Sequence, residues 1–191
     1  MTLGDFLRRV VEILDDARVP YMLTGSLAAA YYATPRATRD IDVVVDPGEA
    51  ALNRVVDGFR EAGFYVDRTA ALEALRSHGQ FNAIDPDSAW KVDLLVRKRR
   101  PFSETEFERR GTATLLGVEV SVASLEDVVL SKLEWAKLAD SELQRRDVAQ
   151  LLERAGARID LEYVERWVRR LDLDSEWKRV RPDPDESGSG G

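Results

Sequence analysis

The feature that most constrains the fold is a run of alternating acidic and aliphatic residues, Asp40-Ile41-Asp42-Val43-Val44-Val45-Asp46. Side chains alternate between the two faces of a β-strand, so the run predicts a strand with Ile41 and Val43 on one face and Asp40 and Asp42 on the other. The other Asp-x-Asp pairs of the chain flank prolines or lie at a predicted helix end. Two carboxylates on one face of a strand are suitable ligands for Mg²⁺, and a solvated, charged strand face is the alternative.

Two other segments offer polar groups to such a site. Gly25 and Ser26 lie between a predicted strand over 21–23 and a predicted small-residue helix over 27–33. Backbone N–H groups at a strand-to-helix turn, with the Ser26 hydroxyl, can bind phosphate oxygens, although an ordinary helix cap fits equally. Asp93 lies in Val92-Asp93-Leu94-Leu95, on another predicted strand. Three carboxylates packed together repel one another, so bound cations would keep them ionised.

Hydrophobic periodicity predicts a mixed α+β fold with a helical carboxyl-terminal portion. We expect a core over 1–122, a helical subdomain over 123–176 and a disordered polar tail over 177–191. The predicted helices cover 4–18, 27–33, 52–62, 69–77, 124–139, 142–155 and 160–171, and the predicted strands cover 21–23, 40–45, 64–66, 81–84, 90–96, 112–116 and 118–122. Turn residues indicate that 81–84 and 90–96 form one hairpin, and that 112–116 and 118–122, which flank Gly117, form either a second hairpin or a bulged continuation of one strand.

Composition excludes several classes of site. The 191 residues contain no cysteine, which rules out disulfides, thiolate zinc sites and cysteine nucleophiles, and they contain one histidine, His78, at a predicted helix end. The sequence lacks an apolar run of about 18 to 20 residues, so we expect a cytoplasmic protein with no membrane partner. A net charge of −7 argues against broad, non-specific nucleic-acid binding.

Basic residues are concentrated in two places near the acidic segments. Arg97-Lys98-Arg99-Arg100 follows the strand that bears Asp93, and it is interpreted either as a solvated turn or as a phosphate-contacting rim for an RNA acceptor or a triphosphate. Arg36 and Arg39 lie between the Gly25-Ser26 turn and Asp40. They could bind triphosphate oxygens or pair with nearby carboxylates.

These motifs together resemble a known signature. Gly25-Ser26, Asp40-Ile41-Asp42 and Val92-Asp93-Leu94-Leu95 are similar to the signature of the DNA polymerase beta-like nucleotidyltransferase superfamily. The segment from Thr24 to Asp42, with Ser131–Lys137 and Arg146-Asp147-Val148, resembles the small bacterial proteins grouped with abortive-infection (AbiEii-type) toxins. The resemblance implies a small mixed sheet that carries the carboxylates and helices that follow it.

The resemblance also implies an activity, which is transfer of NMP from a nucleoside triphosphate to a hydroxyl with release of pyrophosphate. Two Mg²⁺ ions would be held by Asp40, Asp42 and Asp93, and Lys132 and Asp147 would assist, unless they are a surface lysine and an ordinary helix-face carboxylate. In the toxin branch nucleotides are transferred to RNA ends, and the basic run Arg97–Arg100 favours an RNA 3′ end as the acceptor here. A protein hydroxyl and a small hydroxylated antibiotic are alternatives.

The alternative from a different functional class is a protein without catalytic activity. A catalytically silent nucleotidyltransferase-fold module could bind a partner protein or a nucleotide, as one half of a toxin–antitoxin pair with a cognate antitoxin. Mg²⁺-dependent binding of a nucleoside triphosphate is the observation that distinguishes the enzyme from this module.

Overall fold

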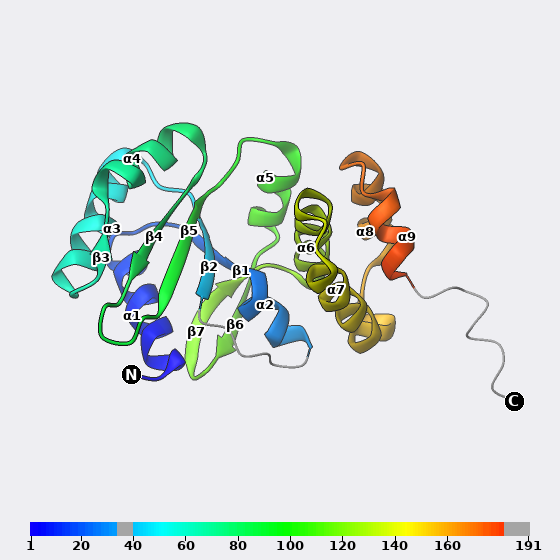
Figure 1. Ribbon diagram of the computed structural model, residues 1–191, viewed down its shortest axis with the longest axis horizontal. Coiled ribbons are helices and arrows are strands. Elements are labelled where there is room, and N and C mark those ends of the chain that lie inside the picture. Colours follow the sequence, from blue (N-terminus) through cyan, green and yellow to red (C-terminus); the bar gives the residue numbers. More distant parts are fainter. Residues whose placement is uncertain (34–39, 182–191) are drawn as a thin grey trace, which may run out of the picture. The chain divides into compact units, whose positions relative to one another are not determined.

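The computed structural model describes residues 1–33 and 40–181, which form two compact units (Figure 1). Residues 1–28 and 40–124 belong to the first unit, and residues 29–33 and 125–181 belong to the second. The first unit therefore ends at residue 124, where the sequence predicts the core to end at 122. The fold class is the predicted one, a mixed sheet with helices and a helical carboxyl-terminal portion.

The first unit is built on a sheet whose strands, in the described residues, have the order β3-β4-β5-β2-β1-β7-β6. The strands are β1 (Tyr21–Thr24), β2 (Asp40–Val45), β3 (Tyr65–Val66), β4 (Gln80–Ile84), β5 (Lys91–Val96), β6 (Gly111–Leu115) and β7 (Val118–Val122). The β4–β5 and β6–β7 pairs are antiparallel, as predicted for the first hairpin and as one of the two alternatives predicted for the second. Strand β2 pairs antiparallel with β1 and parallel with β5, so it lies in the middle of the sheet.

Helices cover the sheet of the first unit. They are α1 (Leu3–Asp16), the start of α2 (Gly25–Tyr32), α3 (Glu49–Glu61), α4 (Arg68–Ser77) and α5 (Pro101–Glu108). Figure 1 shows α1, α3 and α4 together on one side of the sheet. Phe6 of α1 and Phe59 of α3 are fully buried and both pack on Phe64. Helix α5 was not predicted, although Pro101 is its first residue and proline is common at that position.

Burial along the two central strands follows the predicted alternation. In β2, Ile41, Val43 and Val45 are at most 1% exposed, whereas Asp40 is exposed and Asp42 is half-buried. The β5 pattern is the same, with Val92 and Leu94 buried and the residues between them partly accessible to solvent. One face of these strands therefore belongs to the hydrophobic core, and the opposite face carries the acidic side chains.

The second unit is helical. It contains α6 (Leu125–Ala139), α7 (Glu142–Ala155), a short 3-10 helix (Gly156–Arg158), α8 (Leu161–Arg170) and α9 (Asp174–Val180). Ser141 and Asp160 cap α7 and α8, since their side-chain oxygens accept hydrogen bonds from the backbone N–H groups of Gln144 and Tyr163. Helix α9 continues past residue 177, where the sequence predicts the tail to begin, because Trp177 and Val180 are buried.

No helix among residues 1–33 and 40–181 is both long and apolar enough to cross a bilayer.

Candidate active site

The sheet brings Asp42 and Asp93 side by side. Their Cα atoms are register partners in the parallel β2–β5 pair, so both side chains project from the same face. Asp40 lies two residues before Asp42 on that face, and its register partner is Lys91. Acidic residues from separate parts of the sequence therefore meet on one face of two central strands.

Gly25 closes one side of this acidic cluster. It follows β1, whose last residue, Thr24, is the register partner of Asp42. Gly25 has a φ of +64°, and a Cβ atom at this position would lie 2.0 Å from Oδ2 of Asp42. Since α2 begins at Gly25, the backbone N–H groups of its first turn start beside the Asp42 carboxylate.

A lysine that the sequence analysis did not single out lies among the carboxylates. The Nζ of Lys91 is 2.8 Å from Oδ2 of Asp93 and 3.8 Å from Oδ2 of Asp40. The hydrogen bond to Asp93 raises the pKa of Lys91, and the negative charges of Asp93, Asp40 and Asp42 raise it further against the opposing effect of burial. The lysine is therefore a cation at this cluster at neutral pH.

The donor chemistry of the cluster fits a divalent cation. Its ligand atoms are hard carboxylate oxygens, and a positively charged group, the Lys91 ammonium, already contacts two of the three side chains. As they stand, no three Asp, Glu or His side chains in residues 1–33 and 40–181 are arranged as a complete metal-binding group. The Lys91 ammonium is therefore a cation that already contacts the Asp93 carboxylate.

Lys132 and Asp147, which the resemblance assigns to the site, lie in the second unit and contact each other. The Nζ of Lys132 on α6 is 2.7 Å from Oδ2 of Asp147 on α7 and donates a second hydrogen bond to Gln144. The Lys132 side chain is 4% exposed and that of Asp147 is 13% exposed. This is a nearly buried ion pair that links two helices, so the surface-lysine alternative is wrong.

The arginines predicted to contact phosphate groups do not all have the same contacts in the structure. Arg36 and Arg39 lie outside the described residues. Arg97 pairs with Asp46 at 2.9 Å and stacks over Phe107, and its Nε is buried without a hydrogen-bond partner in the described residues. Arg100 donates a hydrogen bond to Ser103.

Only part of the basic run is therefore open to solvent. The exposed residues of the run Arg97–Arg100 are Lys98 and Arg99. The face that the run offers to a phosphate backbone is correspondingly smaller than the sequence suggests.

The comparisons with known proteins rest on structure. No protein-family model matches the chain, and no curated protein sequence matches it. The antibiotic-resistance factor ANT(2'')-Ia, solved in complex with adenylyl-2''-tobramycin, superposes with a TM-score of 0.62 at 16% identity, over 93% of this chain and 99% of that one. The chain has the nucleotidyltransferase fold.

Two further solved structures share this nucleotidyltransferase fold. The lincosamide antibiotic adenylyltransferase LnuA, solved with lincomycin bound, has a TM-score of 0.54 at 12% identity, over 79% of this chain and 96% of that one. An antigenic nucleotidyltransferase-like protein from Paracoccidioides brasiliensis has a TM-score of 0.54 at 17% identity, over 98% and 97%. At these identities the likeness establishes the architecture.

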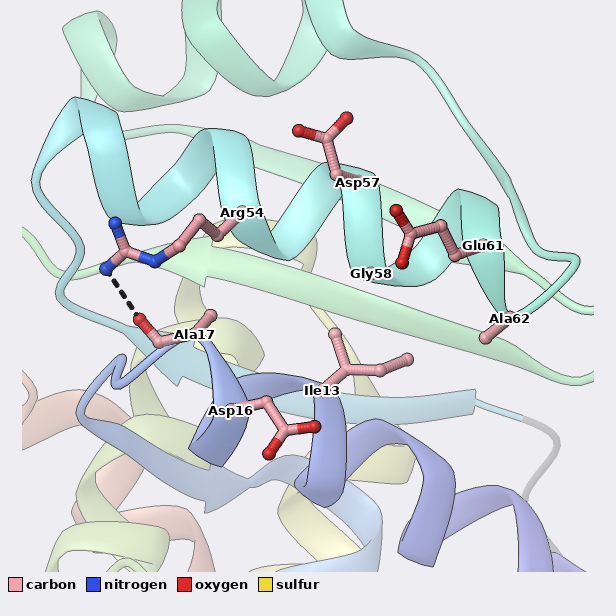
Figure 2. A pocket seen from close by; sticks show the side chains of 8 residues that line it. All are labelled: Ile13, Asp16, Ala17, Arg54, Asp57, Gly58, Glu61 and Ala62. Atoms are coloured by element: carbon pink, nitrogen blue, oxygen red, sulfur yellow. Dashed lines mark hydrogen bonds between the residues drawn. The ribbon is translucent and has the colours of Figure 1, made fainter.

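A groove of about 450 Å³ lies elsewhere on the first unit, between α1 and α3 (Figure 2). Arg54 closes one end of it by donating a hydrogen bond of 2.9 Å to the carbonyl oxygen of Ala17. Asp16, Asp57 and Glu61 give the rest of its lining an acidic character. None of the described site residues lines this groove, so it is separate from the acidic cluster of the nucleotidyltransferase fold.

Lys91 is the site residue that the sequence analysis missed. A signal was present, because Lys91 precedes Asp93 by two residues on a predicted strand and must therefore share its face. No comparable sequence pattern predicts that β5 pairs parallel with β2. That pairing places Lys91 opposite Asp40.

Proposed function

We propose that the protein is an Mg²⁺-dependent nucleotidyltransferase that transfers NMP from a nucleoside triphosphate to a hydroxyl group. The observation that carries the proposal is the register of β2 and β5, which brings Asp42 and Asp93 together with Asp40 on one face. The nucleotidyltransferase fold supports the same reading, because two of its solved examples are named for adenylyl transfer or hold an adenylylated product.

Asp40, Asp42 and Asp93 are the residues that would hold Mg²⁺. Two bound ions would stabilise the negative charge that develops on the α-phosphate and on the attacking and leaving oxygens. Gly25 and Ser26 would receive the β- and γ-phosphates, because the N-terminus of α2 presents backbone N–H groups beside Asp42. Close approach of a phosphate to this backbone requires the absence of a side chain at Gly25.

The proposed reaction exchanges one phosphorus–oxygen bond for another. The acceptor hydroxyl oxygen forms a bond to the α-phosphorus, and the bond from that phosphorus to the bridging oxygen of the β-phosphate breaks. Pyrophosphate leaves with the electron pair of that bond. Asp93 accepts the proton of the hydroxyl, because its carboxylate lies beside those of the strand that would hold the nucleotide.

We propose a small hydroxylated molecule as the acceptor. Support comes from the two antibiotic-modifying structures, one with an adenylylated aminoglycoside and one with lincomycin. The RNA 3′ end favoured from the sequence has less support, since Arg97 and Arg100 are engaged in local contacts. An RNA acceptor and a role in a toxin–antitoxin pair are therefore outcomes that the test must distinguish.

The test is transfer of label from α-³²P-labelled nucleoside triphosphates, with pyrophosphate release measured in parallel. Acceptors are offered separately as aminoglycosides, lincosamides and tRNA. Asp42→Asn should lower the rate by about 100-fold or more, because a metal ligand is lost. Asp46→Asn is the matched control, since Asp46 follows the same strand but pairs with Arg97.

Each result has a distinct meaning. Label in the small molecule supports the proposal, and label in RNA moves the acceptor to the alternative. No transfer to any acceptor, together with no Mg²⁺-dependent binding of a triphosphate, would establish the catalytically silent module instead.

A further inference from the structure

We propose that Lys91 is a built-in counter-ion that occupies part of the metal site until a divalent ion displaces it. The inference rests on the proposed function and concerns how the same site is loaded. Lys91 would hold the carboxylates of two strands together in the absence of metal. It would also make free divalent ions bind weakly, so that a metal ion enters together with the nucleotide.

The position of Lys91 is fixed by two strands. It lies on the same face of β5 as Asp93, and its register partner on β2 is Asp40. Its ammonium contacts both carboxylates, at 2.8 Å from Oδ2 of Asp93 and 3.8 Å from Oδ2 of Asp40. One lysine therefore bridges acidic residues that come from different strands, at the place where a shared metal ion would lie.

Charge makes the lysine and a metal ion competitors. The ammonium offsets part of the repulsion among Asp40, Asp42 and Asp93, which reduces the need for an added cation. A divalent ion bound to Asp93 would repel an ammonium that stayed within hydrogen-bond distance of the same carboxylate. The two cations therefore compete for that carboxylate.

Displacement requires no change in the backbone. The Lys91 side chain is 31% exposed, and its flexible four-carbon stem can turn the ammonium into water. The Asp93 side chain is 17% exposed, and its carboxylate would gain the metal as its new partner. A nucleoside triphosphate brings several negative oxygens, which offset the cost of removing the ammonium and favour joint entry of metal and nucleotide.

The test measures binding of Mn²⁺ alone by titration calorimetry, without nucleotide. Lys91→Met removes the charge and keeps an unbranched side chain of similar length. It should bind Mn²⁺ about tenfold more tightly than the unaltered protein. Lys137→Met is the matched control, because Lys137 pairs with Asp172 at 2.7 Å in the second unit. That variant should bind Mn²⁺ with unchanged affinity.

A second measurement examines the protein without metal. In EDTA, Lys91→Met should unfold at a lower temperature than the unaltered protein, because Asp93 and Asp40 lose the ammonium that contacts them. Mn²⁺ added in excess over the EDTA should remove most of the difference. The double variant Lys91→Met/Asp93→Asn should recover stability in EDTA.

One outcome would overturn the role of Lys91 alone, and another would overturn the proposed function as well. Equal Mn²⁺ affinity for Lys91→Met and the unaltered protein would overturn the role of Lys91 and leave the proposed function intact. No Mn²⁺ binding to either protein, even with triphosphate present, would overturn the proposed function and the inference that rests on it.

Discussion

A Cβ atom on Gly25 would lie 2.0 Å from Oδ2 of Asp42 and 2.6 Å from its Cγ. Real Cβ atoms do not approach other heavy atoms this closely, so the Asp42 carboxylate occupies space that any other residue at position 25 would fill. The φ of +64° at Gly25 is a second reason, because it is energetically unfavourable for most other residues. The glycine is therefore a requirement of the acidic cluster as well as of the turn into α2.

Gly25→Ala should destabilise the protein and displace Asp42. We expect the free energy of unfolding to fall by more than about 1 kcal/mol, because the clash adds to the cost of the left-handed backbone. Chemical denaturation followed by circular dichroism measures this loss. Binding of Mn²⁺ should weaken in the same variant.

Gly117→Ala is the control for that experiment. Gly117 has a φ of +75°, but nothing lies within 4 Å of a Cβ atom at that position. It should show the cost of the backbone conformation alone, with metal binding unchanged. Equal losses in the two variants would contradict a specific contact between position 25 and Asp42.

Asp147→Asn should be strongly destabilising. It leaves the Lys132 ammonium, in a side chain only 4% exposed, without its charged partner. Removal of one member of a buried ion pair costs about 3–5 kcal/mol of unfolding free energy. Lys132→Met/Asp147→Leu should recover much of this loss, since it removes both charges.

The exposed pair Lys137–Asp172 provides the comparison. Its N–O distance is the same, 2.7 Å, but the Asp172 side chain is 93% exposed. Asp172→Asn should leave the free energy of unfolding nearly unchanged, because solvent screens the exposed pair. If the folded Lys132→Met/Asp147→Leu protein transfers nucleotide at the unaltered rate, the pair is structural and the catalytic roles implied by the resemblance are wrong.

Ser88→Ala should produce a stability loss that depends on pH. The Ser88 hydroxyl and backbone N–H donate hydrogen bonds to Oδ2 of Asp85, and the hydroxyl bond is the main cause of the lowered pKa of that carboxyl. A lowered folded-state pKa means that the contribution is present above the ordinary aspartate pKa of about 3.9 and is lost as the pH falls through the folded-state value. The difference between Ser88→Ala and the unaltered protein should be about 1 kcal/mol at pH 7 and should shrink in acid.

Ser77→Ala is the matched control for the pH series. The Ser77 hydroxyl donates a hydrogen bond of 2.9 Å to the backbone oxygen of Glu73, which does not titrate. Its effect on unfolding should be the same at neutral and acidic pH. If the stability loss for Ser88→Ala were the same at neutral and acidic pH, it would contradict the conclusion that this hydroxyl lowers the pKa of Asp85.

Two substitutions of Trp177 should separate the contribution of its aromatic ring to stability from that of its indole N–H group. Its side chain is buried in α9, and its Nε1 is buried without a hydrogen-bond partner in the described residues. Trp177→Ala should cost about 3–5 kcal/mol through the cavity it leaves. Trp177→Phe should cost far less, because it also removes an unsatisfied polar group. Thermal and denaturant unfolding of the two variants provides the measurement.

Local patterns were sufficient to predict most strands and helices. The alternation in Asp40–Val45 and the turn around Asp85 are short-range signals, and the structure confirms both the strand and the hairpin whose strands this turn joins. Helix α5 was missed because its buried face includes Ser103 and Glu106, so it lacks a clean apolar stripe. Helix α9 was missed because its seven residues are mostly charged or polar and only Trp177 and Val180 supply apolar contact.

The candidate site could not be predicted from short segments of the sequence alone, because it depends on which strands pair. The sequence shows that Asp42 and Asp93 are both on strands, but it does not show that those strands are parallel neighbours in register. That pairing depends on which edges the hairpins leave free. The contact of Lys91 with Asp40 follows from the same long-range pairing, whereas its place on the same face as Asp93 follows from their spacing of two residues.

The central position of β2 has a consequence for dynamics. Its backbone is bonded on one side to β1 and on the other to β5, so neither edge is open. Amide hydrogens of such a strand exchange with solvent chiefly when the whole unit unfolds, whereas edge strands such as β3 and β6 fray earlier. The acidic cluster would then keep its geometry through the fluctuations that reach the periphery of the sheet, and deuterium uptake along β2 should be among the slowest in the molecule.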